Sequence, residues 1–186
     1  MTPAHAILET ERLVLRRLTF GDLDDLARLY ADPVVMRFYP SVRTRAQSER
    51  NLRWIIERYA AHPGAGLWAA VGKADGRFLG RCGLIPQIIE RREDLEVGYL
   101  LDPAVWNRGL ATEAARAIRD YAFRAFANAP RLISIIHPDN AASQRVAEKN
   151  GMVHVTNAPF SGFNCRIYAI ARETWTGLSR QEEGVS

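Results

Sequence analysis

Residues 97–126 read VGYLLDPAVWNRGLATEAARAIRDYAFRAF, and residues 131–151 read RLISIIHPDNAASQRVAEKNG. This pattern predicts a strand, a turn of small residues, a long amphipathic helix, a second strand and a short capped helix. The rest of the chain is organised around this unit, and we expect one domain of the α/β class.

The turn at 106–111 lies where the long helix must begin. Gly109 and Ala111 carry no bulky side chain, so an anion can approach the main chain there. The first N–H groups of a helix have no intrahelical partner, and the helix dipole adds partial positive charge at that end. The turn is therefore a candidate phosphate site. A tight loop leading into a helix would need the same small residues, so the flanking sequence has to decide between the two.

The flanking residues resemble the pyrophosphate loop of the GNAT superfamily of acyl-CoA-dependent N-acyltransferases, which has the form Gln/Arg-x-x-Gly-x-Gly/Ala. Trp106 replaces the first Gln/Arg. This departure is similar to the ribosomal-protein N-terminal (RimJ/RimL-like) branch, where Trp-x-x-Gly-x-Ala-Thr-Glu-Ala is common, and the chain continues as TEA at 112–114. A second block, NAASQRVAEKNGM at 140–152, resembles the family's Asn-x-x-Ser…Gly-Phe helix.

The resemblance extends from ERLVLR at 11–16 to YAIARETW at 168–175. It implies a single GNAT-like domain at 9–175, with a mixed, mostly antiparallel sheet that has a central splay and is flanked by about four helices. The termini, 1–8 and 176–186, are expected to be flexible. The implied activity is transfer of an acetyl group from acetyl-CoA, as co-substrate and without a metal, to a primary amine by direct attack in a ternary complex.

By the same resemblance, the pyrophosphate of acetyl-CoA would bind the N–H groups of residues 108–111, with the Arg108 side chain free to add charge. Asn140 would bond the pantetheine arm, and Ser143 would donate a proton to the thiolate of CoA. Plain helix capping is the alternative for both residues. The expected cofactor-binding set is Tyr99, Leu100, Leu101, Trp106, Asn107, Arg108, Gly109, Leu110, Ala111, Thr112 and Asn140.

The strand before the turn carries the expected catalytic base, Glu96. Gly98 interrupts this strand and predicts a bulge that splays it from its neighbour on one side. The freed N–H and C=O groups of residues 99–101 could pair with the amide-like pantetheine arm. A carboxylate that faces an apolar pocket has a raised pKa and can act as a base, directly or through a water. The alternative is that Glu96 is a surface residue or pairs with an Arg of a neighbouring strand.

The remaining segments predict further strands and helices around this unit. A loose leader at 1–10 precedes a half-buried strand at 12–18. Thr44 and Gln47 form a capping box at the start of a helix, and Asp75-Gly76 predicts a β-hairpin.

Two segments are expected to choose the amine acceptor. The apolar linker at 34–40 either walls the acceptor pocket or is a connector folded onto the core. The polar residues 87–93 are expected to form a loop. A pocket lined by carboxylates would favour polyamines or aminoglycosides, and an open groove would favour a peptide.

Composition limits the remaining possibilities. With 186 residues, of which 47% are hydrophobic, the chain suits one domain with a full core. The net charge of +4 comes from scattered Arg residues, so a nucleic-acid partner is disfavoured and a surface that attracts an anionic cofactor explains the charge. Cys82 and Cys165 lack CxxC spacing and predict buried thiols in a reducing compartment. With no long apolar run and no secretory leader pattern, we expect a cytoplasmic protein without a membrane partner.

The acceptor, a protein N-terminus or a small amine, and the oligomeric state, monomer or homodimer, do not follow from these residues. One alternative is a non-catalytic acyl-CoA-binding or regulatory module. Another is an ATP-binding protein that uses residues 109–113. The second is disfavoured because no Gly-Lys-Ser/Thr stands there to reach phosphate and magnesium.

Overall fold

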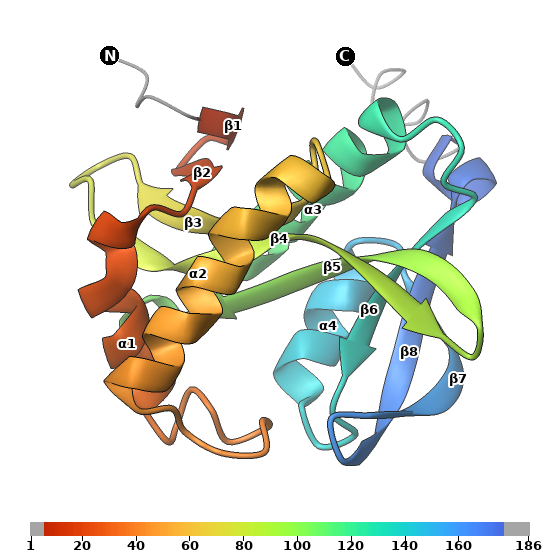
Figure 1. Ribbon diagram of the computed structural model, residues 1–186. Helices are drawn as coiled ribbons and strands as arrows, with labels where there is room; N and C mark the ends of the chain where they lie inside the picture. Colours follow the sequence, from red (N-terminus) through yellow and green to blue (C-terminus); the bar gives the residue numbers. More distant parts are fainter. Residues whose placement is uncertain (1–5, 177–186) are drawn as a thin grey trace.

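One mixed sheet of eight strands organises the computed structural model, which describes residues 6–176 (Figure 1). The strand order is β1-β2-β3-β4-β5-β6-β8-β7, and neighbours are antiparallel except β5 and β6, which run parallel. This confirms the predicted α/β domain with a mostly antiparallel sheet. The strands are β1 (Ala6–Glu9), β2 (Leu13–Arg17), β3 (Gly66–Gly72), β4 (Phe78–Ile89), β5 (Arg92–Leu101), β6 (Arg131–Ile136), β7 (Val153–Phe160) and β8 (Phe163–Ala171). The helices are α1 (Leu23–Ala31), α2 (Arg45–Ala61), α3 (Leu110–Ala125) and α4 (Ala141–Lys149), with 3-10 turns at Phe20–Asp22 and Pro103–Val105.

Helices cover both faces of the sheet. Arg81 of β4 pairs with Leu100 of β5, so their side chains share a face, and the neighbouring Tyr99 side chain takes the other face. The Arg81 guanidinium lies 5.5 Å from the ring centroid of Tyr30 in α1. The Tyr99 hydroxyl donates to the Ser143 carbonyl of α4 at 3.0 Å. Helix α1 therefore covers one face of these strands and α4 covers the opposite face.

The core lies where the apolar faces of the helices meet the sheet. Strand β3 is buried from its second residue to its last, and its Trp68 is 1% exposed. The Trp68 ring meets the ring of Tyr121 in α3 edge-on, with 5.8 Å between centroids. This contact anchors α3 to the centre of the sheet and so fixes where its first turn lies.

Local signals in the sequence have the predicted structural consequences. The Thr44 hydroxyl accepts from the Gln47 N–H, and the Gln47 side chain accepts from the Thr44 N–H at 2.7 Å, which completes the capping box at the start of α2. Asp75-Gly76 lies in the hairpin between β3 and β4. Asn140 caps α4 by accepting from the Ser143 N–H at 3.1 Å.

The structure corrects the expectation of a loop at 87–93. Strand β4 continues to Ile89 and β5 begins at Arg92. Glu90 and Arg91 join them with φ values of 50° and 66°. Two successive left-handed residues give the tight turn that matches the twist of a hairpin, here without glycine. The polar residues of this segment therefore belong to the β4–β5 hairpin and do not form a loop.

The expected flexible leader is also corrected in part. Residues 6–9 form β1, which pairs with β2, so the chain is ordered from Ala6. At the other end, residues 172–176 are helical. The rest of the two predicted flexible termini, residues 1–5 and 177–186, lies outside the described residues.

Strands β5 and β6 separate in the middle of the sheet, as the expected splay requires. They pair only at Leu95↔Leu132 and Glu96↔Ile133, although β5 continues to Leu101. The expected bulge at Gly98 is not present against β4, because the β4–β5 register runs through Gly98 without a shift. The opening therefore comes from divergence of two parallel strands and not from an extra residue.

Candidate active site

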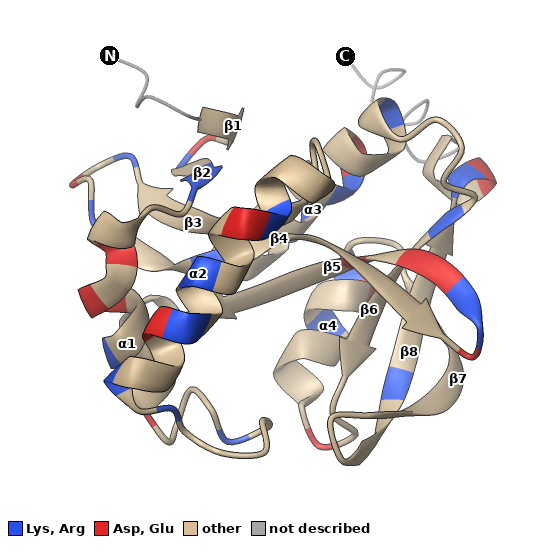
Figure 2. Cartoon of the chain, viewed as in Figure 1, with Lys and Arg blue, Asp and Glu red and all other residues tan. Residues whose placement is uncertain are grey.

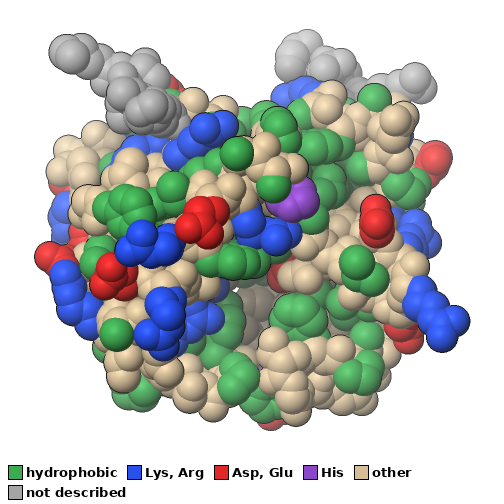
Figure 3. Space-filling view, in the orientation of Figure 1, with side chains coloured by type: hydrophobic (Ala, Val, Ile, Leu, Met, Phe, Trp, Pro, Cys, Tyr) green, Lys and Arg blue, Asp and Glu red, His purple; other side chains and the backbone are tan. Residues whose placement is uncertain are grey.

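A cavity of about 710 Å³ lies over the point where β5 and β6 separate. Figure 3 shows the hollow in the middle of one face of the molecule. Its walls come from segments far apart in the sequence: the α1–α2 linker, β4, β5, the turn before α3, the end of β6, α4 and the β7–β8 hairpin.

The cavity collects nearly all of the residues predicted for the site. Arg108 is the exception, because its side chain is exposed and does not line the cavity. The expectation that this side chain adds charge to a bound pyrophosphate is therefore not supported by its position. The predicted residues that do line the cavity are Glu96, Tyr99, Leu100, Leu101, Trp106, Asn107, Gly109, Leu110, Ala111, Thr112, Asn140 and Ser143.

The turn before α3 has the geometry of an anion-binding loop. Asn107 has φ 59° and Gly109 has φ 78°, so two left-handed residues curl the backbone into the start of the helix. A Cβ at Gly109 would meet only the Arg12 guanidinium, at 3.5 Å, which leaves the backbone accessible. Trp106 fixes the loop to the end of β5, because its indole N–H donates to the Leu101 carbonyl at 2.8 Å.

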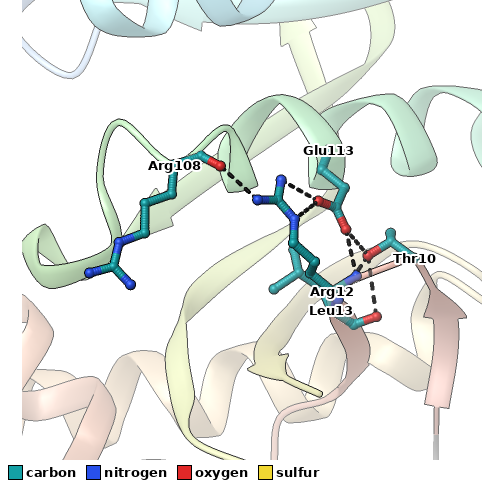
Figure 4. Close-up of polar contacts among 5 residues, drawn as sticks. All are labelled: Thr10, Arg12, Leu13, Arg108 and Glu113. Carbon is teal, nitrogen blue, oxygen red and sulfur yellow. Dashed lines mark hydrogen bonds and ion pairs between the residues drawn. The ribbon is translucent and has the colours of Figure 1, made fainter. Parts of the chain in front are cut away.

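The N-terminal segment braces the same turn from outside (Figure 4). Arg12 donates from its guanidinium to the Arg108 carbonyl at 2.8 Å and to the Glu113 carboxylate at 2.6 Å. Glu113 also accepts from the Arg12 backbone N–H at 2.8 Å and from the Thr10 hydroxyl at 2.5 Å. Glu113 therefore links the first turn of α3 to the segment before β2. These bonds hold the pKa of Glu113 below its usual value, although burial alone would raise it.

The edge of β5 that faces the splay is only partly satisfied by β6. At the point of separation the Ser134 hydroxyl donates to the Val97 carbonyl at 2.8 Å, in place of a backbone bond between strands. Beyond this point, Tyr99–Leu101 have no β6 residue in register. An extended ligand with amide groups could pair with this edge as an added strand.

Helix α4 forms a further wall of the cavity. The Asn140 side chain caps it through the Ser143 N–H, and the Ser143 carbonyl accepts from Tyr99. Ser143 lines the cavity, with the Tyr99 hydroxyl beside it. The capping role of Asn140 is therefore present, and Ser143 has a hydroxyl available to a ligand.

Glu96 lies on the opposite face of β5 from Tyr99, where it lines the cavity. Its carboxylate accepts from the Gln87 amide at 2.7 Å, and no Lys, Arg or His among the described residues lies within 4 Å of it. Burial raises the pKa of Glu96 above its usual value, against the opposing effects of Gln87, the Arg81 charge and the Ile135 N–H. A half-buried carboxylate with a raised pKa is suited to accept a proton.

Sequence reasoning missed several lining residues. The His137 ring contacts the Phe38 ring at a tilt of 30° and the Phe163 ring edge-on, with centroid distances of 5.1 and 4.7 Å, and these contacts join the α1–α2 linker to the β7–β8 hairpin. Their partners are distant in sequence, so no local pattern could reveal them. Arg81 was also missed, although a single cation inside the apolar run FLGRCGLI was a signal that could have identified it.

The linker at 34–40 does line the cavity, as the pocket-wall prediction required.

Cys82 and Cys165 are buried free thiols, as predicted. Among residues 6–176, no helix is both long and apolar enough to cross a membrane.

Comparisons with known proteins identify the family of the chain. A family model described as an acetyltransferase (GNAT) domain matches residues 12–153. The uncharacterized protein YkkB of Bacillus subtilis (strain 168) is 40% identical over 169 residues, which cover 87% of this chain and 96% of that protein.

Two solved acetyltransferase structures share the fold of this chain. An acetyltransferase from Agrobacterium tumefaciens strain C58 matches with a TM-score of 0.75 and 28% identity, over 88% of this chain and 92% of that one. RimL, a ribosomal L7/L12 alpha-N-protein acetyltransferase in complex with coenzyme A, shares the fold with a TM-score of 0.73 and 17% identity, over 90% of this chain and 98% of that one. The chain belongs to the GNAT family, and it is an acetyl-CoA-dependent N-acetyltransferase.

Proposed function

We propose that the protein transfers the acetyl group directly from acetyl-CoA to a primary amine while both are bound in the cavity. The observation that carries this proposal is the separation of β5 from β6 beside a turn that Arg12 braces at the start of α3. The pyrophosphate would bind the N–H groups at the start of α3, and the pantetheine arm would pair with Tyr99–Leu101. The thioester would then lie close to Glu96, which reaches the cavity from the other face of β5.

In this arrangement each chemical requirement of acyl transfer is met by a residue of the site. The acceptor ammonium loses a proton to Glu96, directly or through a water, and the neutral amine attacks the thioester carbonyl. A backbone N–H of the β5 edge would stabilise the charge on the carbonyl oxygen. The C–S bond breaks, and the Ser143 hydroxyl would protonate the thiolate of CoA while it regains, directly or through a water, the second proton that the attacking nitrogen gives up. The products are an amide and free CoA.

The contacts of Trp106 and Glu113 support placing the chain in the RimJ/RimL-like branch of the family. Trp106 ties the turn to β5, and Glu113 ties it to the N-terminal segment, so the sequence WNRGLATEA has a structural basis beyond its two small residues. This motif concerns the cofactor side of the cavity. The acceptor, a protein N-terminus or a small amine, is chosen by the opposite side. Because Cys82 and Cys165 are unpaired thiols, we also propose a reducing, cytoplasmic location.

Release of free thiol from acetyl-CoA tests this function. The purified protein is incubated with acetyl-CoA and a panel of amines and N-terminal peptides, and the thiol is followed with a chromogenic disulfide. We expect amine-dependent release and initial-rate patterns that intersect, as a ternary complex requires. Binding of acetyl-CoA without release for any amine would favour the non-catalytic module instead.

A further inference from the structure

Arg81 is a buried cation without a carboxylate partner. The residue is 7% exposed, its Nε has no hydrogen-bond partner, and no Asp or Glu among the described residues lies within ion-pair distance of it. The other buried arginine, Arg119, provides the contrast. Its guanidinium pairs with Asp120 at 2.8 Å and donates to the Asn150 carbonyl at 2.9 Å. Burying an unpaired charge is costly, so an arginine kept in this state is expected to meet an anion.

Arg81 shares its environment with a second unpaired cation. The guanidinium carbons of Arg43 and Arg81 lie 4.6 and 5.5 Å from the ring centroid of Tyr30. The Tyr30 hydroxyl is buried and also has no hydrogen-bond partner. Burial alone would lower the pKa of Arg81, but the phenol groups of Tyr30 and Tyr39 beside it raise that pKa, so the side chain stays charged. Arg43 and Arg81 thus lie against one tyrosine ring, and neither has a carboxylate partner among residues 6–176.

This group lies on the acceptor side of the cavity. Arg81 and Glu96 are on the same face of the β4–β5 pair, since their strand partners Leu100 and Ile85 alternate in register with them. Both residues line the cavity, and the charge of Arg81 is close enough to Glu96 to lower its pKa. The cofactor edge at Tyr99 faces the other way. An acceptor amine bound at Glu96 would therefore lie in the same part of the cavity as Arg81.

Apart from Glu96, the charged side chains that line the cavity are positive, like Arg81. Arg37 and Arg43 line it from the α1–α2 linker, and Figure 2 shows basic positions along that linker. Glu96 is the single Asp or Glu among the described residues that line the cavity. A polyamine or aminoglycoside would place several positive charges against these arginines, with one carboxylate to offset them. An acceptor that carries an anion would be attracted instead.

We propose that the acceptor is a small amino acid, whose amine is placed beside Glu96 and whose carboxylate is bound by Arg81, with the Tyr30 ring packed against the guanidinium outside the cavity. Arginine presents two parallel N–H donors to a carboxylate, which fixes both position and orientation. This inference rests on the proposed acetyl transfer and names the class of its acceptor. It also gives Arg81 a role as a specificity-determining residue.

The test compares amines that differ only in the carboxylate. Thiol release is measured for each L-amino acid, its carboxamide and the amine left by its decarboxylation, for example phenylalanine, phenylalaninamide and phenethylamine. We expect kcat/KM to be about ten- to a hundredfold higher for one or more of the amino acids than for its neutral counterparts. Arg81→Met should remove this preference through KM, so that an amino acid and its neutral counterparts react with similar kcat/KM; the loss of the Arg81 charge also acts on the pKa of Glu96, but it does so for all amines alike. Arg81→Lys should restore part of the preference, because the charge returns without the paired donors.

Two further measurements separate the possible failures. Acetyl-CoA binding by calorimetry should be unchanged in Arg81→Met, and its melting temperature should not fall, because the variant removes an unpaired buried charge. Arg53→Met is the matched control, since Arg53 is an exposed residue of α2 whose carboxylate partner is Glu49. A clear fall in the melting temperature of Arg81→Met would show that Arg81 is structural and overturn the inference. Equal rates for amino acids and their amides, or acetylation of peptides alone, would overturn it while leaving acetyl transfer intact. No thiol release with any amine would contradict the transfer itself.

Discussion

Replacing Glu113 with Gln should loosen the turn that we propose binds the pyrophosphate. The substitution keeps the shape of the side chain and can keep the acceptor that serves Thr10 and the Arg12 N–H. It replaces the oxygen that accepts from the Arg12 guanidinium with an amide that repels it. Arg12 then loses the partner that holds it against the Arg108 carbonyl.

The magnitude follows from the exposure of the pair. A hydrogen bond to a charged group contributes about 1.5–3 kcal/mol, but Arg12 is 46% exposed, so solvent screening reduces the loss to about 1 kcal/mol. In a domain of this size that loss lowers the melting temperature by about 2–4 °C. A loop residue that is free in the variant must be ordered when acetyl-CoA binds. This weakens the binding free energy by about 1 kcal/mol and raises the Kd for acetyl-CoA about fivefold.

Thermal unfolding and calorimetry with acetyl-CoA measure these two effects. Glu49→Gln is the control, because it breaks an exposed i,i+4 pair with Arg53 on α2, where a change below about 1 °C is expected. The reasoning would be refuted if Glu113→Gln melted and bound acetyl-CoA as the control does.

The pH dependence gives an independent check. The folded-state pKa of Glu113 is lowered, so its stabilisation is complete above the unfolded-state pKa of about 4.5 and is lost as the pH falls through the folded value. The difference in stability between wild type and Glu113→Gln should therefore be largest above pH 5 and shrink in more acidic solution. A difference that does not change with pH would remove the charge of Glu113 from the explanation.

Three further substitutions test the rest of the site. Glu96→Gln should leave acetyl-CoA binding intact and lower kcat. Because the pKa of Glu96 is raised, the wild-type rate should fall as the pH drops through that pKa. An unchanged pH–rate profile in the variant would exclude Glu96 as the base. Gly109→Glu should abolish acetyl-CoA binding, because it places a carboxylate at the start of α3, and the left-handed φ of this position adds about 1–2 kcal/mol of strain. Gly109→Asn is the control, since Asn tolerates that φ and the variant should melt closer to wild type. Equal acetyl-CoA binding by Gly109→Glu and wild type would disprove the loop assignment. Ser143→Ala should lower kcat without changing the Kd for acetyl-CoA, and an unchanged kcat would limit Ser143 to its place in the helix.

Much of the fold could be predicted because its signals are local. The Thr44–Gln47 capping box, the Asp75-Gly76 turn and the Asn140 cap each depend on residues within three positions of one another. The hairpin at 87–93 was missed because its turn, Glu90-Arg91, lacks the glycine or asparagine that usually marks two left-handed residues. The splay was placed near Gly98 for a partly wrong reason, since the strands diverge after Glu96 without a bulge.

The acceptor side of the site could not be predicted in the same way. The cofactor side is built from one continuous stretch, so its spacing is visible in the sequence. The opposite side joins Arg43, Arg81 and Glu96, which come from a linker and two strands, with Tyr30 of α1 packed behind the two arginines. Their proximity depends on tertiary packing, and a lone arginine in an apolar strand does not reveal which ring or carboxylate it will meet.

The central claim is that the cavity at the β5–β6 splay binds acetyl-CoA. Thermal unfolding with and without acetyl-CoA, with ATP as the control nucleotide, tests it most directly. A ligand at a hundred times its Kd stabilises the folded state by about 2.7 kcal/mol, which predicts a rise of about 5–10 °C in the melting temperature. We expect this rise with acetyl-CoA and not with ATP. No rise with acetyl-CoA, or an equal rise with both, would contradict it.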